Sequence, residues 1–197
     1  MLNRCNRKGK VSIMRILLTV GHSKLKNGSI TSADGSKLGG GNEYTYCKSL
    51  SKYLKKALEE KGHDVDRVVC PEGTFSKATE ERTYKLAIEK ANNYDLVIEL
   101  HLNAAATRTA KGCEVLYKST TGKKYANKIQ KQLSKVFKDR GIVKRDNLYI
   151  LNQTKAPAVL VEVFFCTNPT EWKYAVKNKE RIAKLIANGI SDIQRDV

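Results

Sequence analysis

Short apolar runs alternate along this chain with longer segments whose apolar residues recur every three or four positions. The clearest runs are rich in Val, Leu and Ile, and they occupy Arg15–Val20, Asp95–Leu100 and Ala158–Phe165. Apolar runs of this length are typical of strands that are buried on both faces, as in a parallel sheet. The alternation therefore predicts an α/β fold, with βαβ units building a largely parallel sheet that helices cover on both faces.

Weaker patterns complete the expected order of elements. Further strands are expected at Val65–Cys70, Cys113–Tyr117 and Leu148–Leu151. Helices are expected over Glu43–Lys61, Thr79–Asn93, Gly122–Arg140 and from Glu171 onward. The first and third helices are each followed by a glycine placed to end them, Gly62 and Gly141.

The length of 197 residues and a hydrophobic content of 41% suffice for one domain with its own core. No linker and no internal repeat divides the chain, so we expect a single domain over residues 14–197. Residues 1–13 are expected to be a flexible extension, and Met14 is a second candidate start. No run of about 18 apolar residues exists, so we expect no membrane span.

The compartment of synthesis is expected to be the cytoplasm. Residues 1–12 carry basic side chains but lack the apolar region of a secretory signal. The five cysteines are odd in number, scattered and without a Cys-x-x-Cys pair, which is typical of a reducing compartment.

The net charge of +17 favours polyanionic partners. Nucleic acid, anionic lipid and the phosphate-rich polymers of a bacterial wall all meet this condition. The lysines are spread along the chain and few aromatic residues alternate with them, which argues against a dedicated binder of single-stranded nucleic acid.

Two of the three histidines stand where a buried strand ends and a loop begins. His22 follows the first apolar run, and His101 follows Asp95–Leu100. Sites in open α/β sheets lie outside the carboxyl ends of the strands, so two imidazoles delivered there can meet and bind a metal ion. His63, which follows the first helix, is expected to be a surface residue in a turn.

Three carboxylates are candidates for the same site. Glu162 interrupts an apolar run, where an unpaired carboxylate is costly; it is either an edge or ion-paired residue, or a base or ligand in a dry site. Glu43 is either an ordinary first-turn helix acid or, through the flexible Gly39–Gly41, a neighbour of His22. Glu99 shares the face of His101, as a supporting residue or a plain strand charge.

Two histidines and one carboxylate with an open fourth position form a catalytic zinc set, which polarises a carbonyl and activates water. A second carboxylate that does not bind the metal can take the proton of the water and pass it to the leaving amine. The ligands here would come from separate elements. Cys166 lies near this set in the sequence, but nothing marks it as a nucleophile.

Four motifs in order resemble the zinc-dependent N-acetylmuramoyl-L-alanine amidases of the third amidase family, which includes phage endolysins and bacterial autolysins. They are Thr19-Val-Gly-His-Ser23, Asn42-Glu-Tyr44, Glu99-Leu-His-Leu-Asn-Ala104 and Val161-Glu-Val-Phe-Phe-Cys-Thr-Asn168. The resemblance runs from Met14 to the C-terminus and is strongest to the catalytic domains of clostridial phage endolysins.

The resemblance implies a mixed, mostly parallel sheet of about six strands flanked by helices. It also implies Zn²⁺ on His22, Glu43 and His101, with Glu162 as the catalytic carboxylate. The implied reaction is hydrolysis of the peptidoglycan amide that joins N-acetylmuramic acid to L-alanine. Two departures affect expected substrate contacts: Phe164-Phe165 replaces a common Gly-Phe, and no arginine stands four residues before Ala91-Asn92.

Some assignments stay open at the level of the sequence. Asn103 and Asn168 either contact the substrate or shape loops. Two other functions compete with the amidase: a zinc peptidase that cuts within the stem peptide, and a non-catalytic basic nucleic-acid-binding domain. We expect a monomer that acts on peptidoglycan without binding nucleic acid, with teichoic acid attracted by the positive charge. Release to the wall would then need a holin or cell lysis.

Overall fold

Three strands form the centre of the sheet because nearly all of their residues are apolar and buried. They are β1 (Arg15–Val20), β3 (Leu96–Asn103) and β6 (Ala158–Phe165). The structure, a computed structural model, describes residues 13–191. The expected extension over residues 1–13 lies outside the described residues except for Ile13, so it stays a prediction.

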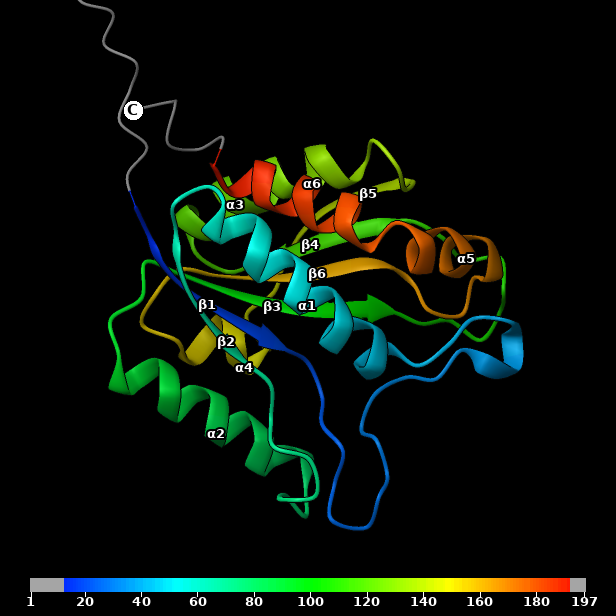
Figure 1. The fold of residues 1–197 in the computed structure, drawn as a ribbon, viewed down its shortest axis with the longest axis horizontal. Helices are drawn as coiled ribbons and strands as arrows, with labels where there is room; N and C mark the ends of the chain where they lie inside the picture. Colours follow the sequence, from blue (N-terminus) through cyan, green and yellow to red (C-terminus); the bar gives the residue numbers. More distant parts are fainter. Residues whose placement is uncertain (1–12, 192–197) are drawn as a thin grey trace, which may run out of the picture.

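The six strands of the sheet run in the order β2-β1-β3-β6-β4-β5 (Figure 1). The outer strands are β2 (Asp64–Val68), β4 (Cys113–Tyr117) and β5 (Asp139–Lys144). Every neighbouring pair is parallel except β4 and β6, which are antiparallel. The prediction of one α/β domain with a mixed, mostly parallel sheet is confirmed.

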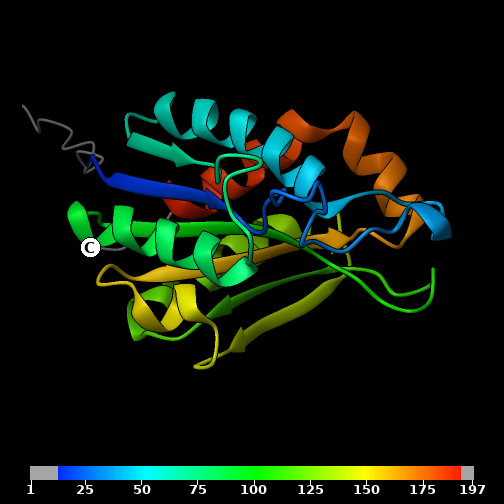
Figure 2. The same cartoon turned by 90° about the horizontal axis from the view of Figure 1, so that it is seen from below.

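Helices cover both faces of this sheet, as predicted (Figure 2). The helices are α1 (Glu43–Glu59), α2 (Ala78–Ala91), α3 (Thr120–Leu133), α4 (Tyr149–Gln153), α5 (Pro169–Lys177) and α6 (Lys179–Ser191). The helices α1, α3 and α6 pack on one face, whereas α2 and α4 pack on the other. Within residues 13–191, no helix has the length and apolar character needed to cross a bilayer.

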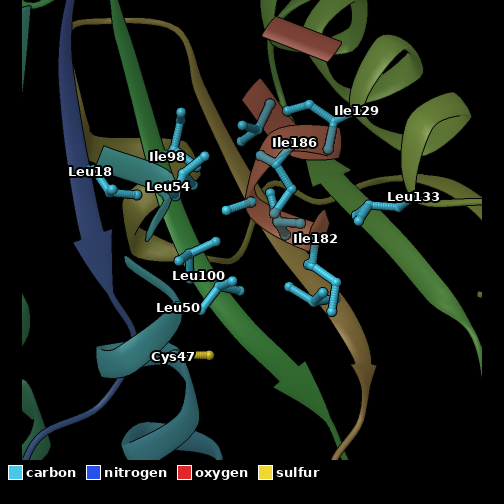
Figure 3. Packing of buried hydrophobic residues seen from close by; sticks show 14 of the residues in the cluster. Leu18, Cys47, Leu50, Leu54, Ile98, Leu100, Ile129, Leu133, Ile182 and Ile186 are labelled. Atoms are coloured by element: carbon cyan, nitrogen blue, oxygen red, sulfur yellow. The ribbon is translucent and has the colours of Figure 1, made fainter. Parts of the chain in front are cut away.

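The larger core lies between the sheet and α1, α3 and α6 (Figure 3). The apolar stripe of α1 supplies Leu50 and Leu54, which meet Ile98 and Leu100 of β3. On the opposite face, a smaller cluster joins the first half of the strands to α4 and α2. The two faces therefore differ in coverage, and the carboxyl ends of the strands on the α2 side remain free for polar side chains.

Two predicted elements were wrong, although six strands were expected and six are present. The helix expected over Gly122–Arg140 ends at Leu133, and the chain then forms β5. Gly141 lies inside β5 with φ 83°, next to the β-branched pair Ile142-Val143 that favours a strand. The expected strand Leu148–Leu151 is instead part of α4, whose apolar run buries one side of a short helix.

His63 is not the surface residue that its position after a helix suggested. Its side chain is buried, and Nδ1 accepts a hydrogen bond of 3.4 Å from the backbone N–H of Met14. Nε2 lies 3.3 Å from the Ser191 hydroxyl. Burial, together with the nearby Lys61, lowers the pKa of His63 below its usual value. The residue therefore links the start of β1 to the end of α6.

This burial predicts a pH-dependent stability. Because the pKa of His63 is lower in the folded state, the unfolded chain takes up the proton first, and stability falls as the pH drops through about 6.5. Replacing His63 by Gln removes this titration. Between pH 8 and pH 5, we expect the melting temperature of the wild type to fall further than that of His63→Gln. Equal losses in the two proteins would contradict this.

Candidate metal centre and active site

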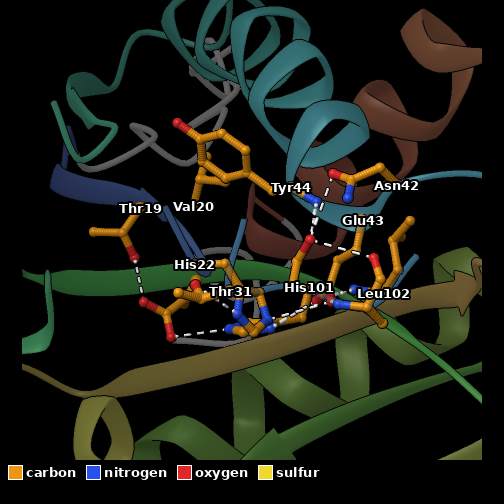
Figure 4. A network of polar contacts seen from close by, with 12 residues as sticks. Thr19, Val20, His22, Thr31, Asn42, Glu43, Tyr44, His101 and Leu102 are labelled. Carbon is orange, nitrogen blue, oxygen red and sulfur yellow. Dashed lines mark hydrogen bonds and ion pairs between the residues drawn. The ribbon is translucent and has the colours of Figure 1, made fainter. Parts of the chain in front are cut away.

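Three side chains from separate elements meet beside the carboxyl ends of β1 and β3 (Figure 4). His22 follows β1, Glu43 is the first residue of α1, and His101 lies within β3. His22 Nε2 is 3.3 Å from one carboxylate oxygen of Glu43, and His101 Nδ1 is 3.0 Å from the other. The two rings stand edge to face with centroids 4.9 Å apart. The structure thus brings together the three residues that the sequence indicated.

The pleat of the sheet explains why these groups lie on one side. His101 and Glu162 are partners in the β3–β6 pair, and Glu162 and Glu114 are partners in the β6–β4 pair. Side chains of partners point to the same face, so the three form one row across three strands. Gly21 directly follows the β1 residue that pairs with Leu100, which places it beside His101 at the other end of this row.

Gly21 gives the imidazole its space. A Cβ atom at this position would lie 2.2 Å from Cε1 and 2.3 Å from Nε2 of His101. Its backbone N–H instead donates to the carbonyl of Leu100 at 3.0 Å and fixes the end of β1 against β3. The absence of a side chain is therefore a steric requirement of the site.

His22 has a left-handed backbone, with φ 67°. Within residues 13–191 it is the only non-glycine residue with positive φ, a conformation that costs about 1–3 kcal/mol. The turn is held by Ser23, whose carbonyl accepts from the Thr31 N–H and whose hydroxyl donates to Glu81. This strained turn aims the imidazole back across the end of β1.

The Gly39–Gly41 segment brings Glu43 to the histidines through close packing. Added Cβ atoms at Gly40 and Gly41 would lie 1.7 Å from the Cys166 carbonyl oxygen and 2.2 Å from the Trp172 ring, respectively. The loop is thus pressed onto the end of β6, and α1 begins with its first side chain inside the site. Sequence reasoning anticipated this proximity but ascribed it to flexibility.

Glu43 is held as an ionised carboxylate. Its two oxygens accept backbone hydrogen bonds from Leu102 at 3.0 Å and Ala33 at 3.1 Å. Burial alone would raise the pKa of Glu43, but the hydrogen bonds to His101 and His22 outweigh it and hold the pKa well below its usual value. The side chain therefore keeps its charge where a cationic partner is needed.

His101 lies between two carboxylates. Nδ1 faces Glu43, and Nε2 lies 3.1 Å from Glu99. Burial would lower the pKa of His101, yet the hydrogen bonds to Glu43 and Glu99 raise it to about 10. Positive charge is therefore strongly favoured at this point of the structure. With Glu99 as acceptor for Nε2–H, Nδ1 is the nitrogen whose lone pair a metal cation on the His22–Glu43 side would take in place of a proton.

The geometry of the three residues fits a zinc ion. Zinc binds nitrogen and oxygen at about 2.0–2.2 Å, which places neighbouring ligand atoms of a tetrahedron about 3.3 Å apart. Each imidazole lies at about this distance from one oxygen of Glu43, His22 at 3.3 Å from Oε2 and His101 at 3.0 Å from Oε1. One ligand atom from each of the three residues lies within 4.8 Å of the other two, so small shifts of the side chains suffice to bind the ion. Two imidazoles and one carboxylate also match the donor set of catalytic zinc sites.

Glu162 lies beside this cluster, as the strand partner of His101. Its strand is central, not an edge, and its Oε2 is a buried atom with no hydrogen-bond partner among the described residues. Burial raises the pKa of Glu162 to about 7, with Glu43 and Glu114 adding to the rise against the opposing effect of His101. Neither an edge position nor an ion pair accounts for this carboxylate, which is available for proton transfer.

Sequence reasoning missed Glu114, whose alternation with apolar residues in Cys113–Tyr117 was the available signal. Its Oε1 accepts from the Asn103 amide at 2.6 Å, so Asn103 holds a charged neighbour of Glu162. Asn168 instead caps α5, where its Oδ1 accepts from the backbone of Thr170 and Glu171. Asn168 therefore shapes the start of this helix, and its amide also donates to the Ala110 carbonyl.

Phe164, which replaces a glycine common in the resembling family, packs in the core. Its buried ring lies edge to face with Tyr46 at 5.0 Å and stacks on Phe137 at 5.5 Å. Cys166 is buried as well, and burial raises the pKa of its thiol to about 12, which disfavours a nucleophilic thiolate.

Two cavities open on either side of the histidines. One of about 300 Å³ lies toward α2 and α4, and one of about 610 Å³ lies toward β4 and β6. Both are lined by the two imidazoles and by the loop before α4; the residues that they share are His22, His101, Asn147, Leu148 and Leu160. The candidate site is thus accessible from two sides of the imidazoles.

Comparisons with known proteins agree on the family and the fold. The profile of the N-acetylmuramoyl-L-alanine amidase family matches residues 16–192. The solved catalytic domain of the CD27L endolysin, described as targeting Clostridia Difficile, has a TM-score of 0.86 and 47% identity. That match covers 91% of this chain and 97% of the other.

Two curated relatives are longer proteins. The uncharacterized protein CPE1502 of Clostridium perfringens is 31% identical over 91% of this chain and 52% of its own length. The probable cell wall amidase LytH of Staphylococcus saprophyticus is 27% identical over 79% of this chain and 49% of its own length. The chain thus spans about half the length of these two relatives.

The contact between Gly21 and His101 yields a prediction. Gly21 has no positive φ, so Gly21→Ala acts only through its added methyl group, which must displace the imidazole. We expect zinc affinity to fall by on the order of tenfold or more, since metal sites depend on ligand orientation. Isothermal titration would measure it. Gly28→Asn, which adds a side chain in open space at a left-handed position that Asn tolerates, is the control. Equal affinities in both variants would contradict the steric role.

Proposed function

The chain belongs to the N-acetylmuramoyl-L-alanine amidase family, and from this premise we propose that it is a zinc-dependent amidase acting on peptidoglycan. The bond cleaved is the amide between N-acetylmuramic acid and L-alanine. The metal ligands are His22, Glu43 and His101, and the catalytic carboxylate is Glu162. The observation that carries the proposal is an unpartnered carboxylate beside a cluster with the donor set and spacing of a zinc site.

When bound at this cluster, zinc polarises the amide carbonyl and lowers the pKa of a water molecule toward about 7. The protein's own groups prepare the site for that chemistry. Glu43 keeps its charge through two backbone donors, and Glu99 fixes His101 in the tautomer that offers Nδ1. These contacts favour one arrangement of the ligands before the metal arrives.

Glu162 performs the proton transfers. Its ionised carboxylate takes a proton from the attacking water and returns it to the amide nitrogen as the carbon–nitrogen bond breaks. Burial and the nearby carboxylates raise its pKa to about 7, so both protonation states are accessible near neutral pH. Because Oε2 has no partner among residues 13–191, no hydrogen bond has to break before it accepts the proton.

The two cavities suit a substrate that continues on both sides of the scissile bond. Peptidoglycan carries a glycan strand on one side of this amide and a stem peptide on the other. Asn147 and Leu148 line both cavities and stand where the two parts would meet.

Product analysis tests the bond that is cut. Digestion of purified Gram-positive walls should free new N-terminal L-alanine, should require about one zinc per chain and should stop with EDTA. New amino groups on another stem-peptide residue would instead identify a peptidase. A protein with neither metal nor activity, and with salt-sensitive DNA binding, would be a basic binding domain.

Paired variants separate the roles of the site residues. We expect Glu162→Gln to keep its zinc and lose most lytic activity, because the amide cannot accept the proton. We expect His22→Ala and His101→Ala to lose zinc as well, because each removes a ligand. Metal analysis and turbidity loss of wall suspensions measure both. Full activity in Glu162→Gln, or stoichiometric zinc in both histidine variants, would disprove the assignments.

We also propose that the charge of +17 retains the protein on the wall through teichoic-acid phosphates. Exposed charge pairs are screened by salt, so binding to purified walls should weaken between about 50 and about 500 mM salt. Walls stripped of teichoic acid provide the control and should bind less at low salt. Binding that is insensitive to salt and to stripping would argue against this mode of retention.

A further inference from the structure

Helix α2 buries three charged side chains that the proposed reaction does not use, and two of them, Glu81 and Lys85, face the site. Glu81 and Lys85 are one helical turn apart, so they share a face. Their exposed fractions are 3% and 1%, although most of the helix surface is polar. Acidic and basic residues are rarely buried this far unless they are paired. Both side chains point toward the end of the sheet that carries the two histidines.

Lys85 connects to His101 through Glu99. Its ammonium lies 2.5 Å from Oε2 of Glu99 and donates to the Val20 carbonyl at 3.2 Å. The other oxygen of Glu99 faces Nε2 of His101 at 3.1 Å. One oxygen of this carboxylate is therefore fixed by the helix, and the other is left for the imidazole.

Two further hydrogen bonds hold the same oxygen of Glu99. The hydroxyls of Thr19 and Tyr149 each donate to Oε2 at 3.2 Å. Together with Lys85, they give one oxygen three donors and leave Oε1 with His101 alone among the described residues. A carboxylate fixed in this way cannot rotate away from the imidazole without losing several charge-assisted hydrogen bonds.

Glu81 connects to His22 through Thr31. The Thr31 hydroxyl donates to Oε2 of Glu81 at 3.4 Å and lies 3.4 Å from Nδ1 of His22. Once a metal ion at the cluster takes the lone pair of Nε2, the proton of the neutral His22 ring lies on Nδ1, which can then donate to the Thr31 hydroxyl. Glu81 also accepts from the Ser23 hydroxyl in the strained turn. The same helix thus reaches the outer nitrogen of the second imidazole.

We propose that Glu81 and Lys85 are positioning residues that fix the orientation of both histidines. This inference rests on the proposed zinc site, because it assigns the two outer imidazole nitrogens their partners. An imidazole held only at its metal-facing nitrogen can rotate and change tautomer, whereas a partner on the other nitrogen prevents both. Lys85 acts on His101 through Glu99.

The role of Lys85 is tested by measuring zinc affinity instead of activity. For Lys85→Met we expect the zinc dissociation constant to rise about 10–100-fold in chelator competition, as is typical when an outer partner of a ligand is lost. The visible spectrum of the Co²⁺-substituted protein should change, because it reports ligand geometry. Lys90→Met, on the exposed side of the same helix, should match the wild type in both measurements.

A double variant separates positioning from plain stability. Lys85→Met leaves Glu99 buried without its cation, so its melting temperature should fall. Lys85→Met/Glu99→Gln removes both charges, and its metal-free melting temperature should recover. Its zinc affinity should stay low, because a neutral amide is a weaker acceptor for Nε2–H of His101. Recovery of both properties together would show a structural role only and would overturn the proposal.

The contact from Glu81 to His22 is tested with Thr31→Val, which removes the hydroxyl that links the two residues and keeps the shape of the side chain. We expect zinc affinity to fall by about tenfold or more, whereas Thr83→Val on the exposed side of α2 should have no effect. If the wild type binds zinc and the Lys85 and Thr31 variants bind it equally well, this inference fails alone. If the wild type binds no zinc, the proposed function fails with it.

Discussion

Because side chains alternate along a pleated strand, β1, β3 and β6 each divide their residues between two unequal faces. One face, which includes Leu18, Ile98 and Val161, is covered along its length by α1, α3 and α6. On the other, α2 and α4 cover only the first half, around Leu17, Val97 and Leu160. The last residues on that side, His101 and Glu162 among them, meet two cavities instead of a helix. The site exists because this face is incompletely covered, and it lies where the βαβ order places strand ends together.

The electrostatics of the site follow from that placement. Carboxylates from β3, β6 and α1 are brought close together in a part of the molecule with limited access to water, which is costly unless cations offset them. Lys85 offsets Glu99, and the histidines offset Glu43. Among residues 13–191, Glu162 has no ion-pair partner, and its burial raises the pKa of its carboxyl group. The same surplus of negative charge that raises the pKa of His101 also favours a metal cation between the imidazoles.

The helix α2 is the least typical part of this arrangement. Its apolar contribution to the smaller core is modest, and its buried face instead carries Glu81, Lys85 and Glu89. Glu89 accepts from the backbone of Lys155 and Ala156 in the loop before β6. One helix thus joins the support of both histidines to the start of the strand that carries Glu162. A helix that acts through polar contacts can orient several elements at once, because hydrogen bonds fix direction as well as distance.

The sequence by itself determined the central strands, the helix from Glu43 and the positions of His22, His101 and Glu162, because local periodicity and strand ends depend on neighbouring residues. It did not determine the change from helix to β5 after Leu133 or the helix α4, since short apolar runs fit either structure until tertiary contacts decide. It also could not assign Glu99 or His63. Each is defined by a partner far along the chain: Lys85, on another element, for Glu99, and the backbone of Met14 for His63. Only the tertiary structure decided those roles, because the hydrogen-bond partners of a buried polar group come from residues that folding brings close to it.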